Sequence, residues 1–268
     1  MKIKQILGIG MASAVILACA TNPVTGRKSL QLASNQEIAT MAVQQYKETL
    51  NKSKVIKGTT AAKQIQTVGM RLQNAAANYY RSIGREADLS AFNWEYNLID
   101  DAQVNAWCMP GGKVAVYTGI LPVTKDDTGM AVVLGHEISH ALAGHGNERI
   151  SQAMAAQYGS VLLGLGSSSS TLMNVIRQAY PYGAQMAILK YGRNQELEAD
   201  QMGLYIMAMA GYDPRQAQPF WHRMESMSKG QRQPEFLSTH PSPESRRADI
   251  EKHLPRALEY YKAAGGKL

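Results

Sequence analysis

The sequence is poor in several residue types, and each shortage excludes a class of protein. Aromatic residues make up only 7% of the 268 residues, and no basic run is interleaved with them, so nucleic-acid binding is not indicated. No internal repeat is present, and no long apolar run occurs outside the N-terminus. The whole sequence is 45% hydrophobic and 18% charged, which indicates a globular chain with a substantial core.

The N-terminus has the pattern of a signal peptide. Lys2 and Lys4 precede an apolar run, residues 6–18, that is too short to be a permanent membrane span. The following Ile-Leu-Ala-Cys resembles the lipobox of bacterial lipoproteins, with Cys19 as the lipidated residue. The alternative is ordinary cleavage after Ala18-Cys19-Ala20. If Cys19 carries lipid, Cys108 has no disulfide partner, and its thiol is expected to be buried.

Residues 19–33 are predicted to be a lipidated tether, because they contain turn signals at Asn22-Pro23 and Thr25-Gly26. The remainder, 34–268, is predicted to be one mostly helical α+β domain with a small antiparallel sheet over residues 93–118. The segment 228–239 is expected to be a loop. Helices are expected over about 34–50, 60–80, 127–145, 148–163, a segment from Glu196 to Gly211, 213–227, and from Ser242 onward.

The most informative motif is His136-Glu137-x-x-His140 within the apolar run MAVVLGHEISHALAGH. On a helix, residues four apart lie on one face, so the two imidazoles can hold one Zn²⁺. Glu137 lies beside them, where its carboxylate can accept a proton from the attacking water. An unligated histidine pair in such an apolar helix would be costly, which argues against two ordinary histidines.

A catalytic zinc needs a third protein ligand. The spacing after His140 excludes the metzincin pattern, since His145 is one residue too early. In the segment RNQELEAD, Glu196 and Asp200 are four residues apart, so Glu196 can ligate the metal while Asp200 accepts a hydrogen bond from a ligand histidine. Glu198 is the rival ligand, but it points about 160° away from Asp200 on a helical wheel.

Together, HEISH, ELEAD and STHPSPESR resemble the M48 peptidases, which are related to the CAAX prenyl proteases and the heat-shock protease HtpX. More narrowly, the chain resembles their bacterial envelope lipoproteins of the BepA, LoiP and YcaL type. The segments TNPVTGRKSLQL and NAWCMPGGKVAVYTGIL extend this resemblance over most of the chain. The resemblance implies a gluzincin-like zinc metalloendopeptidase with one Zn²⁺ held by His136, His140 and Glu196.

The resemblance also implies roles for further residues. His240 approaches the metal, either as an extra ligand or as a hydrogen-bond donor to the oxyanion, and the alternative is a helix-capping histidine. Asn105 and Ala106 resemble the edge strand that aligns substrate, and the alternative is a sheet-core segment. Arg246 can pair with Asp200 or with substrate carbonyls, or lie on a helix surface.

The function implied by the resemblance is hydrolysis of misfolded or stalled proteins of the bacterial envelope, including outer-membrane β-barrel precursors. The protein would be anchored through Cys19 on the periplasmic side, at the outer membrane. The alternative is a periplasmic chaperone or assembly factor with a latent protease site. A third possibility, a lipid-anchored binding module with a vestigial metal site, is disfavoured by the intact Glu137.

Overall fold

The computed structural model describes residues 19–162, 191–228, 234–240 and 243–268, so the predicted signal peptide lies outside the described residues. Most of this part of the chain is helical. The α-helices are α2 (Asn35–Asn51), α3 (Thr60–Ser82), α4 (Leu121–Thr124), α5 (Asp127–Leu142), α6 (His145–Leu162), α8 (Arg193–Met209), α9 (Ala217–Ser228), α10 (Glu235–Thr239) and α11 (Pro243–Ala263). Three 3₁₀ turns accompany them: η1 (Glu86–Leu89), η2 (Thr118–Ile120) and η4 (Pro214–Gln216).

Helix starts follow from local capping chemistry. Ser34 and Glu37 form the expected reciprocal capping box that begins α2. Thr59 and Asp126 cap α3 and α5, each by accepting a hydrogen bond from a backbone N–H three residues later. Asp213 caps the turn η4 that leads into α9. These side chains satisfy amides that have no partner within their own helix.

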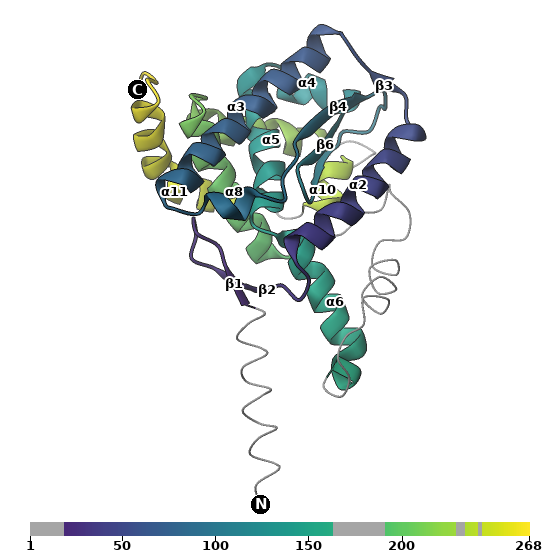
Figure 1. The fold of residues 1–268 in the computed structure, drawn as a ribbon. Coiled ribbons are helices and arrows are strands. Elements are labelled where there is room, and N and C mark those ends of the chain that lie inside the picture. The colour runs from purple at the N-terminus through teal and green to yellow at the C-terminus, as the bar shows by residue number, and fades with distance from the viewer. Residues whose placement is uncertain (1–18, 163–190, 229–233, 241–242) are drawn as a thin grey trace, which may run out of the picture.

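Within the described residues, the main sheet has four strands in the order β3-β4-β6-β5. Figure 1 labels β3, β4 and β6 of this sheet. They are β3 (Val55–Ile56), β4 (Glu95–Ile99), β5 (Ala106–Met109) and β6 (Lys113–Tyr117). The pair β5–β6 is antiparallel, as expected, and β3, which lies outside the predicted sheet, pairs with β4 in the antiparallel sense. The central pair β4–β6 is parallel, because β5 lies beyond β6 and the chain between β4 and β6 reverses direction twice.

Helices cover both faces of this sheet. On one face α2 packs against β5 and β6, where Tyr46 donates a hydrogen bond to the carbonyl of Val114 (2.7 Å). On the other face lie α3 and α5, with α8 behind them (Figure 1). Alternate residues of β6 serve the two cores: Val114 and Val116 face α3 and α5, whereas Ala115 and Tyr117 face α2. This arrangement confirms the predicted α+β fold and places α5 at its centre.

The segment expected to be a tether is instead partly ordered. Strands β1 (Cys19–Thr21) and β2 (Lys28–Leu30) form an antiparallel hairpin. The chain after it is fixed to α6, because the Leu32 amide donates to the Ser151 hydroxyl (2.8 Å) and Asn147 donates to the Ala33 carbonyl (2.8 Å). The turn signals that suggested a tether therefore shape a tight hairpin loop.

A second difference concerns residues 228–239, for which a loop was expected. Their described part includes the short helix α10, and Phe236 within it is fully buried. Burial of one aromatic ring holds this turn against the core, a tertiary effect that local composition does not reveal. Among the described residues, no helix has the length and apolarity needed to cross a membrane.

Candidate metal centre

Helix α5 places the two histidines and the glutamate of the H-E-x-x-H motif inside the protein. His136, Glu137 and His140 are all 1–2% exposed. The helix is apolar on every side from Met130 to Leu134, as expected for a helix surrounded by other elements. The motif is therefore screened from bulk water.

Helix α8 supplies the carboxylates by packing closely on α5. Gly135 and Gly203 face one another where the two helices cross, and a Cβ atom at Gly203 would lie 2.9 Å from backbone atoms of Gly135 and His136. The backbones approach this closely because neither residue has a side chain. The crossing brings the first turn of α8, with Glu196, alongside His136 and His140.

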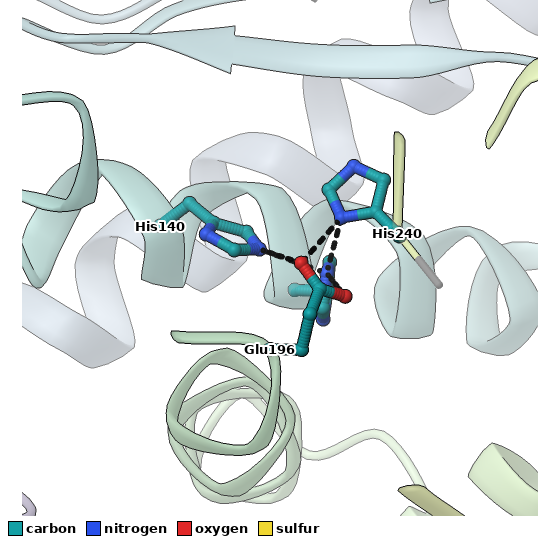
Figure 2. A group of neighbouring side chains, drawn as sticks. His140, Glu196 and His240 are labelled. Atoms are coloured by element: carbon teal, nitrogen blue, oxygen red, sulfur yellow. Dashed lines mark hydrogen bonds and ion pairs between the residues drawn. The ribbon is translucent and has the colours of Figure 1, made fainter. Parts of the chain in front are cut away.

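Four side chains meet at one point: His136, His140, Glu196 and His240. One donor atom from each lies within 4.8 Å of the others. The His140 Nε2 atom is 3.0 Å from His136 Nε2 and 3.3 Å from Glu196 Oε1 (Figure 2). Three imidazole nitrogens and a carboxylate oxygen are the donor set that Zn²⁺ prefers.

The electrostatics of the cluster also suit a cation. Burial lowers the pKa of His136 to about 4, so its imidazole is neutral and has a lone pair available. Burial alone would raise the pKa of Glu196, but His240 and Arg246 outweigh it and keep the carboxylate charged. Oε2 of Glu196 is buried and accepts no hydrogen bond among the described residues, although Arg246 Nη1 lies 3.2 Å away. The residues present fit a zinc ion, as the sequence predicts.

His136 is oriented by a buried ion pair. Its Nδ1 atom lies 2.9 Å from Oδ1 of Asp200, the predicted partner. Both oxygens of Asp200 accept hydrogen bonds from Arg246, each 2.6 Å long. Arg246 also stacks over Trp221, with 3.8 Å between the guanidinium carbon and the ring centre. Arg246 is 1% exposed, so the suggestion of a surface arginine is wrong.

His140 is oriented by a chain of residues that the sequence reasoning missed. His140 Nδ1 lies 2.8 Å from His145 Nδ1, and His145 Nε2 lies 2.8 Å from Oε2 of Glu198. Glu198 in turn binds Thr25 and Arg27 of the β1–β2 hairpin loop. The sequence signal was present, since Glu198 points away from Glu196 and His145 follows His140 by five residues.

Glu137 faces β5, the last strand in the order of the sheet. Its carboxylate accepts a hydrogen bond from the backbone amide of Cys108 in β5, and its Oε1 atom lies 3.4 Å from His240 Nε2. Burial raises the pKa of Glu137 to about 7, while the neighbouring His240 opposes the rise. A carboxylate whose pKa lies near neutrality is suited to accept a proton and return it.

The predicted substrate strand is at the sheet edge, since β6 is the only strand that pairs with β5 in the part of the chain that the structure describes. The side-chain oxygen of Asn105 accepts a hydrogen bond from the Ala106 amide (2.9 Å), and both residues are buried. A cavity of about 270 Å³ opens beside this edge next to His140. Its wall includes Asn22 of the hairpin, Tyr80, Asp88 and Phe92. The arrangement leaves room for a side chain of a peptide near the metal centre.

Comparison with known proteins places this geometry among peptidases. A model of peptidase family M48 matches residues 63–254. The chain is similar to the mitochondrial metalloendopeptidase OMA1 of Schizosaccharomyces pombe, with 38% identity over 172 residues, 63% of this chain and 49% of that protein. The metalloendopeptidase OMA1 of Danio rerio is 29% identical over 254 residues, 89% of this chain and 51% of that protein.

A bacterial relative, the beta-barrel assembly-enhancing protease of Yersinia pestis, is 29% identical over 197 residues, 69% of this chain and 37% of that protein. The matches therefore cover about a third to a half of the length of these relatives. Mitochondrial and bacterial relatives both occur, so the comparisons support the peptidase class more directly than the bacterial lipoprotein type.

Proposed function

The chain belongs to peptidase family M48, and from this premise we propose that it cleaves misfolded or stalled proteins of the bacterial cell envelope. Membership confirms the predicted enzyme class, a zinc metalloendopeptidase, and its cofactor. The envelope substrates are inferred from the N-terminal signal pattern and from the bacterial relative described as a beta-barrel assembly-enhancing protease.

The location in the envelope rests on the N-terminal residues. A lipid on Cys19 would anchor the protein to the periplasmic face of the outer membrane. In the structure Cys19 is exposed at the start of β1, where a modifying enzyme could reach it. Fractionation of cells that express Cys19→Ala tests this point, because loss of the anchor should release the protein from membranes. A variant that still sediments with membranes would argue against the lipid anchor.

The chemistry follows from the arrangement around the metal ligands. His136, His140 and Glu196 would hold the zinc ion, which would supply a Lewis acid for the scissile carbonyl and for water. Glu137 accepts the proton of the attacking water and passes it to the leaving amine. The edge strand β5 holds an extended peptide by main-chain hydrogen bonds, for which Asn105 must release the Ala106 amide. The cavity beside His140 receives one side chain of that peptide.

The observation that carries this mechanism is the buried Glu137 carboxylate beside the ligand cluster. The Glu137→Gln protein should keep zinc and lose roughly 10²–10⁴-fold in turnover of unfolded casein, because an amide cannot accept the proton. The surface variant Glu48→Gln serves as the matched control and should retain full activity. Equal turnover by the Glu137→Gln and parent proteins, at equal zinc content, would remove Glu137 from this role.

His240 favours a second candidate function, an assembly factor with a latent protease site. Its Nδ1 atom lies 2.9 Å from Glu196 Oε1 and 3.2 Å from His136 Nε2, within the ligand cluster. From this position His240 would be able to act as a fourth ligand of a bound zinc ion and would then exclude the water needed for hydrolysis. The proposed enzyme is then restrained until a substrate or partner displaces the histidine.

The substitution His240→Ala distinguishes the roles. If His240 restrains the enzyme, basal proteolysis should rise. If it donates a hydrogen bond to the oxyanion, turnover should fall by roughly 10²–10³-fold. Proteolysis and zinc content that are both unchanged would leave His240 as the C-terminal residue that ends α10.

A further inference from the structure

The loop between β1 and β2 is connected to the metal centre by a series of hydrogen bonds, although Arg27 does not contact a ligand residue among the hydrogen bonds and ion pairs of the described residues. Arg27 donates from Nη1 and Nη2 to both oxygens of Glu148 (2.8 and 2.7 Å) and from Nε to Glu198. Thr25 donates its hydroxyl to the other oxygen of Glu198. The loop thus fixes a carboxylate on α8 that is itself 4% exposed.

The hydrogen-bond directions between Glu198 and the metal follow from what each atom can do. For His140 Nε2 to bind a metal, that nitrogen must be unprotonated, so the ring proton is on Nδ1. That proton is donated to His145 Nδ1, and the proton of His145 is then on Nε2. The latter is donated to Oε2 of Glu198, an oxygen that can only accept in this contact. In this series of hydrogen bonds, the tautomer of His140 determines the tautomer of His145.

The position of Glu198 depends on the loop. Its two carboxylate oxygens accept hydrogen bonds from Thr25 and Arg27 of the loop and from His145. Arg27 forms ion pairs with two buried carboxylates, Glu148 and Glu198. If Arg27 were removed, no other arginine among the described residues would bridge these two carboxylates. Repulsion between them would favour rotation of Glu198 away from His145.

We propose that the loop between β1 and β2 is a working part of the metal centre, in which Arg27 positions the ligand His140 through Glu198 and His145. The inference concerns how the chain holds its metal and is independent of which substrates it cleaves. It assigns a role to the NPVTGR segment beyond that of a spacer. Arg27 is a positioning residue, because it touches neither metal nor substrate.

Zinc affinity of the full chain, purified in detergent, provides the test. The variants Arg27→Ala and Glu198→Gln are titrated against a chelator of known affinity, and the melting temperature of each zinc-free protein is recorded. Second-sphere losses typically cost about 10–100-fold in metal affinity. We expect a loss at the lower end of this range, about 10-fold, for Arg27→Ala, because Arg27 is separated from the ligand His140 by three hydrogen bonds. Arg27→Lys keeps the charge and should restore part of the affinity.

The double variant decides whether Arg27 acts through Glu198. In a Glu198→Ala background, which is also titrated alone, Arg27→Ala should have no further effect on zinc affinity, because that background lacks the acceptor of the His145 hydrogen bond. The matched control is Arg215→Ala, which removes an arginine that is paired with Asp213 on the surface, away from the metal. Zinc affinity unchanged by Arg27→Ala would overturn the proposal. A loss of equal size in both backgrounds would also overturn it. If Arg27→Ala does not fold, the zinc release rate of Arg27→Lys, alone and with Glu198→Ala, gives the same comparison.

Discussion

The two histidines of one motif are supported in two different ways. His136 meets a carboxylate directly, and the Asp200–Arg246 pair behind it is sealed, with both side chains 2% exposed. His140 meets a second imidazole, and the carboxylate behind that imidazole is held by Arg27, whose side chain is 25% exposed. The contacts that support His136 lie within the core, whereas those that support His140 extend through His145 and Glu198 to a hairpin at the surface.

The difference predicts which substitutions around the metal centre have the smaller effect on metal binding. Substitution of one partner of a buried carboxylate–arginine pair is strongly destabilising, because it leaves an uncompensated buried charge. A support that ends at the surface can be altered with less cost, since solvent replaces lost contacts. We therefore expect substitutions around His136 to affect the metal more strongly than equivalent ones around His140.

The largest effect should come from Glu196, the ligand that both sides share. Binding free energies of structural zinc are roughly 10–16 kcal/mol and are divided among four ligands, so Glu196→Ala should weaken zinc binding roughly 10²–10³-fold. Glu198→Ala, on the same helix, should cost less because it breaks only the support of His140. Metal analysis after dialysis measures both. A greater loss in Glu198→Ala would reverse the assignment of the ligand.

A smaller effect is expected when each support is broken separately. Asp200→Asn should lower zinc affinity by about 10–100-fold, because the neutral amide cannot hold both His136 and the buried Arg246. Glu198→Gln should cost less, since its partner Arg27 is partly solvated. Chelator competition with the two variants side by side gives the ratio. Equal losses would show that exposure of the supporting arginine is irrelevant.

The smallest effect concerns the stability of the zinc-free protein in acid. Burial raises the pKa of Asp200, yet Arg246 outweighs it, so the pKa in the folded protein lies below the unfolded value of about 3.9. The stabilisation is complete above that value and is lost as pH falls through the folded pKa. Melting temperatures from pH 6 to pH 3 should therefore fall less steeply in Asp200→Asn than in the parent. Parallel curves would mean that Asp200 titrates alike in both states.

The sequence predicted well those features that depend on local spacing. The capping box at Ser34 and the positions of His136, His140 and Glu196 follow from helical periodicity and cap chemistry. Contacts between segments far apart in the sequence could not be predicted from it. The hairpin loop meets Glu198 across 171 positions of sequence, and nothing local in Arg27 reveals that contact. The parallel β4–β6 pair was missed for the same reason, because strand order is set by tertiary packing.

The Gly135–Gly203 contact has a consequence for which ions the site accepts. Because the two backbones touch, the distance between the histidines on α5 and Glu196 on α8 is set by the main chain and cannot relax inward. The helix–helix distance at this contact therefore limits the size of the ion that fits between the ligands. A methyl group at Gly203 would push the helices apart and widen the cage. Gly203→Ala should then shift preference from Zn²⁺ toward the larger Cd²⁺, which competition between the two ions would detect.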